Sequence, residues 1–474
     1  MKILVVNPPA YNNMDFIREG RCMQTKSSWA ALWMPLSLCY ISAILRKDNH
    51  EVRLVDCIAE KTDTEKLVDL AVGFIPDIVV MNTAIPSVSG DMNAAGEIKK
   101  AIPRIKIIVI GMYPSIFEKE SLEKFPQADY AIMDEPEWII GPLVRAIKAG
   151  GALTGIKGLI HRKSNDIIIN ERQNLADNNL DDLPFPSRDL LNNDSYRLPT
   201  TGEKFTLMSV GRGCSESCIY CIANLYYGRR FRKRSVENVM AEIAECTDRH
   251  HIRSFLFWGE SFTTDPAYGE AICDEIIKRN IKITWSATSR VDTLNPVLLK
   301  KMKKAGCILL GLGIESYDQK ILNNSRKRTT IEQINKAISM VKIAGIKSMG
   351  HFVFGLPGDT RESAKNTIKF ALQNVAFAQF YCAIPYPKTE LGRLAAENGW
   401  ISNYNYEDLD FTRSVMGNET MSAGEIKKIR DFAYRKFYSS PRVVLRTLRE
   451  IKSVKSFFSA LSFIKWIKPT GKIS

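Results

Sequence analysis

The stretch Gly211-Arg212-Gly213-Cys214-Ser215-Glu216-Ser217-Cys218-Ile219-Tyr220-Cys221 follows an apolar, strand-like segment, Phe205 to Val210. Its cysteines have the spacing Cys-x3-Cys-x2-Cys, so the three thiols must share one tight loop. Soft thiolate ligands suit iron–sulfur clusters, copper(I) or zinc. Such a loop can hold three corners of a cubane cluster, and it leaves the fourth iron without a cysteine.

Other interpretations of the three cysteines are weaker. Structural zinc takes four protein ligands, usually as two separated pairs, and no second pair follows the loop. The four-cysteine spacing of ordinary ferredoxins is also absent. The remaining alternative is three unrelated core cysteines, because free cysteine is often buried as a small hydrophobe. The glycines that open the loop and Tyr220 beside its last cysteine favour the cluster.

With an aromatic residue before its third cysteine, this loop resembles the radical S-adenosylmethionine (radical SAM) enzymes. In that family the three cysteines hold a 4Fe–4S cluster, and its open iron binds the amino and carboxyl groups of SAM. The reduced cluster cleaves SAM to a 5′-deoxyadenosyl radical. The resemblance implies that Cys214, Cys218 and Cys221 are the cluster ligands; the loop alone implies only an open-site cluster.

Length and composition indicate a cytoplasmic protein of two or three domains. The chain has 474 residues, of which 45% are hydrophobic and 25% charged, as in ordinary globular proteins. Ten cysteines in a chain of this length are not a disulfide framework, and a cluster loop indicates a reducing compartment. The apolar run at Met1–Pro9 is too short for a signal peptide. No stretch approaches the ~20 apolar residues that cross a bilayer.

Residues 1–150 alternate strand-like and helical runs, which predicts a doubly wound parallel sheet. In such sheets ligands bind at the carboxyl ends of the strands. The predicted strands are Ile3–Asn7, Glu51–Asp56, Asp77–Asn82, Lys106–Gly111 and Tyr130–Met133, and the predicted helices are Leu36–Lys47, Lys61–Phe74, Gly90–Ala101 and Glu137–Ala149.

This first domain resembles the Rossmann-like, cobalamin-binding domain that precedes the radical SAM core in one large subfamily. The resemblance rests on Asn7-Pro8-Pro9, the helix start at Pro35-Leu36-Ser37-Leu38, the Gly111 turn and the acidic turn Asp134-Glu135-Pro136-Glu137. It implies cobalamin as a cofactor, with contacts from residues at the strand ends. These are Thr83, Ser87, Gly111 and Glu135.

The sequence lacks the Asp-x-His-x-x-Gly motif that supplies a lower axial histidine to cobalt in cobalamin-dependent mutases and methionine synthase. Gly111-Met112-Tyr113-Pro114 also stands where the subfamily commonly has Gly-Gly-Pro-His. A doubly wound domain that has lost its cofactor, or binds another one, is therefore the alternative.

Residues 151–204 are predicted to be a linker that contains a small β-hairpin, Ile156–His161 with Ile167–Asn170, and a Pro-punctuated acidic segment. From residue 205 to 396, βα units of about thirty residues resemble the partial (β/α)6 barrel of the radical SAM family. Barrel chemistry gathers at the carboxyl ends of the strands. The predicted strands are Thr206–Val210, Ser254–Trp258, Thr284–Thr288, Ile308–Gly313, Lys347–Phe354 and Ala376–Ala383.

Motifs after these strands resemble the SAM-binding motifs of the family, in the same order along the chain. Trp258-Gly259-Glu260 is similar to the Gly-Gly-Glu motif, which implies that Gly259 and Glu260 hold the SAM amino group. Ser286 and Arg290 stand where the family places ribose and carboxylate contacts. An arginine fork suits a carboxylate, but an arginine after a strand is also often only solvated.

Two later motifs complete the series. Gly311-Leu312-Gly313-Ile314-Glu315-Ser316 resembles the Gly-x-Glu-Ser strand, in which glycine lets the backbone approach the adenine and the acid reaches sugar or amino groups. This implies Gly313 and Glu315 as further SAM contacts. Gly355-Leu356-Pro357-Gly358 predicts a tight turn.

Residues 397–474 are predicted to form helices Ala423–Tyr438 and Arg442–Trp466. The second is apolar on one face and rich in basic residues, like helices that lie in an anionic membrane surface. Its alternative is a helix packed on the barrel with its lysines in solvent. Membrane contact would favour a lipid or isoprenoid-like substrate.

The sequence thus predicts a radical SAM enzyme that binds cobalamin and methylates an unactivated carbon of a small-molecule substrate. The resemblance covers residues 1–400 and extends to class B methylases and the anaerobic magnesium-protoporphyrin ester cyclase, so oxidative cyclisation or rearrangement is the first alternative. A non-catalytic iron–sulfur redox sensor is the second, although a sensor would not need Glu260, Arg290 and Glu315.

Three kinds of partner follow from these predictions. A radical SAM cluster implies a reductant protein such as flavodoxin or ferredoxin. The basic C-terminal helix implies peripheral membrane contact. The net charge of +14 suggests nucleic acid, but no interleaved aromatic and basic pattern supports RNA binding.

Overall fold

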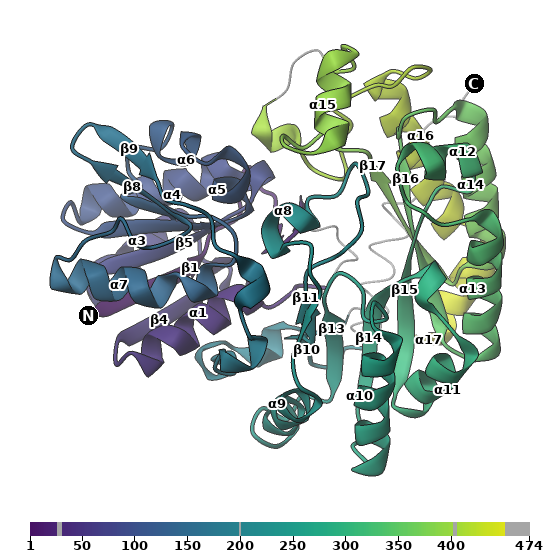
Figure 1. Ribbon diagram of the computed structural model, residues 1–474, viewed down its shortest axis with the longest axis horizontal. Helices are drawn as coiled ribbons and strands as arrows, with labels where there is room; N and C mark the ends of the chain where they lie inside the picture. The colour runs from purple at the N-terminus through teal and green to yellow at the C-terminus, as the bar shows by residue number, and fades with distance from the viewer. Residues whose placement is uncertain (26–30, 199–200, 402–404, 451–474) are drawn as a thin grey trace.

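The structure of the protein is a computed structural model that describes residues 1–25, 31–198, 201–401 and 405–450. Two sheets, one of seven and one of six strands, organise these residues into two lobes that lie side by side in Figure 1. The predicted α/β class is confirmed, with a doubly wound parallel sheet ahead of a barrel-like one.

The first sheet has the strand order β4-β1-β5-β6-β7-β8-β9, and its strands are parallel from β4 to β7. All five parallel strands were predicted within two residues of their ends. The sheet is formed by β1 (Lys2–Asn7), β4 (Glu51–Asp56), β5 (Ile78–Thr83), β6 (Lys106–Gly111), β7 (Tyr130–Ile132), β8 (Leu159–Lys163) and β9 (Asp166–Ile169).

Helices cover both faces of this sheet because its strands are apolar on both sides. One face packs on α3 (Thr64–Phe74), α4 (Val88–Ala101), α5 (Met112–Phe117) and α6 (Glu120–Glu123). The other face packs on α1 (Leu36–Lys47) and α7 (Ile140–Ala149). A short helix, α2 (Cys57–Glu60), follows β4.

Two hairpins extend the first lobe. The predicted hairpin is present as β8 and β9, and it adds two antiparallel strands to the sheet through β7. A second hairpin, β2 (Phe16–Glu19) and β3 (Cys22–Thr25), has no counterpart in the sequence predictions. Alternation is hard to recognise in strands of four residues, which explains the omission.

The second sheet has six parallel strands in the order β10-β13-β14-β15-β16-β17, and its two edge strands do not pair within the described residues, so the barrel is open. The strands β14 and β15 are longer than predicted. They end at Arg290 and Glu315. The strands are β10 (Phe205–Ser209), β13 (Ser254–Trp258), β14 (Thr284–Arg290), β15 (Cys307–Glu315), β16 (Lys347–Phe354) and β17 (Phe377–Cys382).

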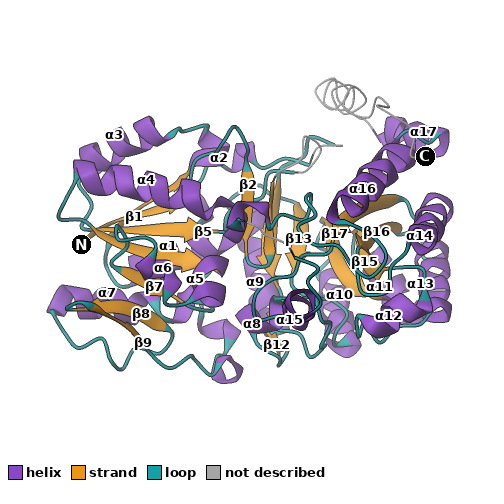
Figure 2. Cartoon of the chain, turned by 90° about the horizontal axis from the view of Figure 1, so that it is seen from above, coloured by secondary structure: helices purple, strands orange, loops and turns teal. Residues whose placement is uncertain are grey.

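The outer face of this sheet is packed, whereas its inner face, the lumen, is partly open. Figure 2 shows helices outside the curved strands: α9 (Val236–Asp248), α10 (Pro266–Lys278), α11 (Pro296–Lys304), α13 (Ile331–Ile343) and α14 (Arg361–Asn374). Along β14, β16 and β17 every second side chain is buried under them. Side chains that alternate with these stay partly exposed: Thr288, Met349, His351, Phe377, Gln379 and Tyr381.

The C-terminal region begins as predicted. The helix α16 (Ala423–Tyr438) has the predicted bounds and packs on β17. The following helix is described as α17 (Pro441–Glu450), and the rest of the predicted membrane-surface helix lies outside the described residues. Within the described part of the chain, no helix is long and apolar enough to cross a bilayer.

Candidate functional site

The cysteine loop lies between β11 (Gly211–Arg212) and α8 (Ala223–Tyr227), beyond the carboxyl end of β10. Gly213 turns the chain with φ of +95°, and a Cβ there would lie 2.1 Å from the carbonyl oxygen of Arg230. Backbone hydrogen bonds then hold the loop on two sides. The N–H of Cys214 donates to Gly228 O (3.2 Å), and that of Leu391 donates to Ile219 O (2.9 Å).

Cys214, Cys218 and Cys221 are free thiols, each partly buried. Burial raises the pKa of Cys214, and it raises that of Cys221 to about 11, so a metal would have to displace their protons. In the described residues no three His, Cys, Asp or Glu side chains are arranged to hold one metal ion. A single zinc ion draws its sulfurs together through bonds of about 2.3 Å, whereas a cubane cluster spreads its ligands over separate irons. Three partly exposed thiols on one fixed loop fit the cluster.

Glu260 approaches this loop from the end of β13. Its Oε2 accepts the backbone N–H of Gly213 at 3.2 Å, while its buried Oε1 lacks a hydrogen bond among the described residues. The nearest cation is Arg21 of the β2–β3 hairpin, whose Nε lies 3.5 Å from that oxygen. Burial raises the pKa of Glu260 despite Arg21. An ammonium group donating to Oε1 would satisfy this carboxylate, so the site fits the amino group of SAM.

Arg290 and Glu315 lie at the carboxyl ends of neighbouring strands. Arg290 binds Asp292 (Nε to Oδ1, 2.9 Å) and donates to the carbonyl oxygen of Lys327 (3.1 Å). The Nζ of Lys327 donates in turn to Glu315 Oε1 at 2.7 Å, and both side chains are buried. Burial alone would lower the pKa of Lys327, but Glu315 and Cys218 raise it. The predicted SAM contacts therefore share one charged network with a lysine beside the cluster loop.

The other predicted SAM contacts line the same end of the lumen. The carbonyl oxygen of Gly259 accepts a hydrogen bond from Thr288 Oγ1 at 3.1 Å, and Ser286 is partly exposed two residues earlier on β14. A Cβ on Gly313 would lie 2.8 Å from Lys327 Nζ. Glycine at position 313 thus leaves room for the lysine.

The predicted cobalamin contacts at the first sheet lie apart from this network and are buried. Thr83 Oγ1 donates to Ile110 O (2.7 Å), and Gly111 has φ of +104° with its Cα against Thr83 O. Ser87 Oγ donates to Asp91 (2.7 Å) and accepts from Arg18 of β2 (3.0 Å). In this conformation these side chains offer no exposed polar atom to a cofactor, so their role as contacts stays a prediction.

Glu135, the fourth of these residues, is fully buried between the lobes. Its carboxylate binds Arg232 of β12 (Arg232–Lys233), with one Nη1–Oε2 bond of 3.1 Å, and lies 3.3 Å from Arg212 of β11. Arg212 also binds Glu137 at 2.8 Å. Two acids of the first lobe and two arginines of the second therefore form a buried interdomain joint.

The lumen holds a further polar group that the sequence predictions missed. His351 lies on β16 with its Nδ1 3.2 Å from Tyr381 Oη, and Tyr381 donates to Gln379 Oε1. Burial lowers the pKa of His351 to about 4, so the ring is neutral. Reading alternate residues of Lys347–Phe354 as one face would have placed His351 in the lumen with Met349. No sequence signal indicates Arg21 or Lys327.

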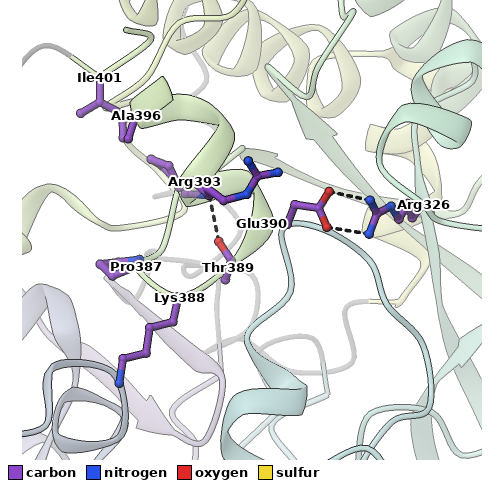
Figure 3. A pocket seen from close by; sticks show the side chains of 10 residues that line it. Arg326, Pro387, Lys388, Thr389, Glu390, Arg393, Ala396 and Ile401 are labelled. Carbon is purple, nitrogen blue, oxygen red and sulfur yellow. Dashed lines mark hydrogen bonds and ion pairs between the residues drawn. The ribbon is translucent and has the colours of Figure 1, made fainter. Parts of the chain in front are cut away.

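A hollow of about 950 Å³ opens beside α15 (Glu390–Glu397), on the segment that is bonded to the cysteine loop at Ile219. Figure 3 shows Glu390 facing Arg326, joined by two hydrogen bonds of 2.6 Å. Lys388 leaves this segment toward the first lobe and binds Glu118 at 2.6 Å. The cations of the hollow are thus paired with acids.

Two family descriptions match this chain. "Radical SAM superfamily" matches residues 208–371, which include the cysteine loop and most of the barrel strands. "B12 binding domain" matches residues 27–140, which span most of the first sheet.

Several relatives match most of the chain. An uncharacterized methyltransferase, PH0819, from Pyrococcus horikoshii is 32% identical over 452 residues, which is 95% of both chains. The anaerobic magnesium-protoporphyrin IX monomethyl ester cyclase of Rubrivivax gelatinosus is 24% identical and covers 86% of this chain and 74% of its own.

Among solved structures, the radical S-adenosylmethionine methyltransferase TsrM from Kitasatospora setae, with cobalamin and a [4Fe-4S] cluster bound, has a TM-score of 0.69. It is 18% identical and covers 84% of this chain and 78% of its own, so the likeness is one of fold.

Proposed function

This chain belongs to the radical SAM superfamily, in the branch that carries a B12-binding domain, and from this premise we propose that it methylates an unactivated carbon of a small-molecule substrate. The cofactors of the branch are a 4Fe–4S cluster, SAM and cobalamin. The methyl-transfer assignment is supported by the methyltransferase that is 32% identical over 95% of the chain.

One observation of the site carries the proposal. Three partly buried thiols on a fixed loop lie beside a buried glutamate with one oxygen that lacks a hydrogen bond within the described residues. Together they match what an open-site cluster and the amino group of SAM require. The SAM network of Arg290, Lys327 and Glu315 would be unnecessary in a redox sensor.

We assign the residues as follows. Cys214, Cys218 and Cys221 hold the cluster, and Glu260 with the backbone of Gly259 holds the SAM amino group. Arg290 and Ser286 orient its carboxylate and ribose, and Gly313 and Glu315 its nucleoside end. Residues 1–150 carry cobalamin, 151–204 connect the lobes, 205–396 form the catalytic core, and 397–474 form the basic tail.

When bound, the cofactors supply reductive cleavage of SAM and a methyl donor. The chain's own residues orient SAM and exclude water. The Glu260 side chain is only 5% exposed, so its charge acts on a bound ammonium at low dielectric. The pinned loop keeps the thiols in register with the lumen, where the substrate would lie. No step here depends on Thr83, Ser87, Gly111 or Glu135.

A second candidate is radical oxidative cyclisation without methyl transfer. It is favoured by the magnesium-protoporphyrin ester cyclase relative, which matches 86% of this chain. Its site would use the same thiols and SAM contacts, so the two reactions differ in their products.

The partners follow from the chemistry. The cluster needs a one-electron reductant such as flavodoxin or ferredoxin, and a reducing compartment supports a cytoplasmic location. The basic C-terminal segment supports contact with an anionic membrane and, with it, a lipid or isoprenoid-like substrate.

The test is anaerobic reconstitution with iron and sulfide, then incubation with SAM, reductant, methylcobalamin and an extract of the native host cells. Methylation of one C–H bond consumes two SAM molecules and gives one 5′-deoxyadenosine and one S-adenosylhomocysteine. Both products, with cobalamin retained on desalting, are expected from the wild type and neither from Cys218→Ala. Formation of deoxyadenosine without S-adenosylhomocysteine would contradict methylation and favour cyclisation.

A further inference from the structure

The lumen of the second sheet carries a histidine with one free acceptor. Within the described residues, the Nε2 of His351 makes no hydrogen bond, whereas its Nδ1 faces Tyr381 Oη at 3.2 Å. A Cβ added to Gly311 would lie 2.8 Å from Nε2, so the ring lies over the bare Cα of that glycine. The inner face of the sheet thus has a hydrogen-bonding atom that the fold does not use.

The bonding around Tyr381 determines which nitrogen carries the proton. Tyr381 Oη donates its proton to Gln379 Oε1, and a phenol has only one proton to give. The oxygen can therefore only accept from His351, which places the imidazole proton on Nδ1. Nε2 is left with a lone pair. The rings of His351 and Tyr381 are also nearly parallel, with an interplanar angle of 5°.

Strand register places this acceptor beside the SAM contacts. Arg290 pairs with Gly313, Gly313 with His351, and His351 with Gln379, so all four belong to one layer of the lumen. The layer below contains Met349 paired with Phe377, both partly exposed. His351 and Gln379 thus continue the SAM layer onto β16 and β17, above an apolar floor.

We propose that His351 is a specificity-determining residue, whose Nε2 accepts a hydrogen bond from the substrate while Tyr381 and Gln379 hold the ring in the required tautomer. The substrate belongs to the class of molecules that carry an O–H or N–H donor next to an apolar part. The donor faces His351, and the apolar part lies on Met349 and Phe377. This assignment rests on the proposed function only in that the substrate gives a hydrogen atom to the radical derived from SAM.

Two substitutions separate the two nitrogens of the ring. In His351→Gln the side-chain oxygen can stand where Nε2 stood, and the contact with Tyr381 is lost. In His351→Asn the amide stands near Nδ1, so the contact with Tyr381 is kept and the acceptor of the lumen is lost. If Nε2 contacts the substrate, His351→Gln should keep more deuterium transfer than His351→Asn. If the role of His351 is purely structural, His351→Asn should keep more.

The probe is an extract of small molecules from native host cells grown in D₂O, given to the reconstituted enzyme with unlabelled SAM and reductant. Each SAM cleaved takes one electron from the reductant and one deuterium atom from a substrate C–D bond, which yields monodeuterated 5′-deoxyadenosine. Mass spectrometry of this nucleoside reports a substrate in the lumen whether the radical is later methylated or cyclised. S-adenosylhomocysteine in the same samples tests methyl transfer separately.

We expect deuterium transfer to fall about tenfold in His351→Asn and to be largely kept in His351→Gln, because one hydrogen bond is worth about 1.4 kcal/mol. Cleavage of SAM without extract should be equal in all three proteins. Deuterium transfer should also fall several-fold in Tyr381→Phe, because the imidazole proton is then no longer held on Nδ1. This variant replaces the other two in the test if either of them loses its cluster. Deuterium transfer by His351→Asn that equals or exceeds that of His351→Gln would overturn the assignment. A wild-type enzyme that transfers no deuterium would overturn it too. Transfer without S-adenosylhomocysteine would overturn only the methylation.

Discussion

At the carboxyl edge of the first sheet, Ser87 and Glu135 are buried and bound to arginines. At the second sheet, Glu260 and His351 each keep one polar atom that makes no hydrogen bond within the described residues. Ser87, Glu135 and Glu260 look alike in the sequence, as polar residues after apolar strands, whereas His351 lies within β16. A buried polar group costs free energy unless it is hydrogen-bonded. Glu137 Oε2 and Arg232 Nε of the joint also lack a hydrogen bond among the described residues, but the acids and arginines there pair with one another. At the second sheet the unused atoms of Glu260 and His351 face the lumen, where we propose that a ligand binds.

The largest expected effect comes from replacing Cys221 by serine in the cysteine loop, at the carboxyl end of the second sheet. The loop should lose its cluster, so iron content falls from about four atoms per chain toward none and SAM cleavage is abolished. The matched control is Cys22→Ser, because Cys22 is also a partly buried free thiol but lies on β3. Absorbance near 400 nm and iron analysis give the answer. Equal loss in both variants would contradict the assignment of the loop.

Replacing Glu135 by alanine tests the first edge. It leaves Arg212 and Arg232 buried without their shared acid, which should cost about 3–5 kcal/mol in the free energy of unfolding. Glu397→Ala, which removes an exposed partner of Arg393, should cost less than about 1 kcal/mol. Urea unfolding measures both. If Glu135→Ala instead lowers cobalamin retention and leaves stability unchanged, Glu135 is a cofactor contact and not part of the joint.

The sequence predicted the elements of the fold far better than the partners of each side chain. Apolar strands and amphipathic helices are local patterns, which is why α16 and the five parallel strands of the first sheet were predicted closely. Glu135 was placed correctly at a strand end, but its arginines lie 77 and 97 residues further along the chain, on β11 and β12. Arg21 reaches Glu260 from a hairpin with no local signal. Pairings of this range depend on tertiary packing, which spacing along the chain does not encode.

Glu19, the last residue of β2, is a buried acid whose effect on stability should depend on pH. It is buried beside Ser37, and burial raises its pKa from 4.5 to about 7. Below pH 4.5 the carboxyl is protonated in both the folded and the unfolded chain. Between pH 4.5 and 7 only the unfolded chain loses the proton, so stability falls as pH rises, by about 3 kcal/mol in all.

Glu19→Gln should therefore be more stable than the wild type by up to about 3 kcal/mol at pH 8, and the gain should shrink toward pH 5. The amide oxygen can still accept from Ser37. Urea unfolding of both proteins across this range measures the difference. A gain that does not change with pH would show that the pKa of Glu19 is the same in the folded and the unfolded protein, so that burial does not raise it.

The smallest expected effect comes from Glu260 at the second sheet, where one substitution should change SAM binding without changing protein stability. Glu260→Gln keeps the shape of the side chain and an acceptor for Gly213, but it removes the charge opposite the bound ammonium. We expect SAM affinity, measured by equilibrium dialysis on the cluster-loaded protein, to fall about tenfold. Stability should stay near that of the wild type, because Arg21 at 3.5 Å makes no hydrogen bond to the carboxylate. Glu390→Gln, in the exposed pair with Arg326, should leave SAM affinity unchanged. A large loss of stability in Glu260→Gln would instead make Arg21–Glu260 a second joint between the lobes, and the contrast between the two edges would disappear.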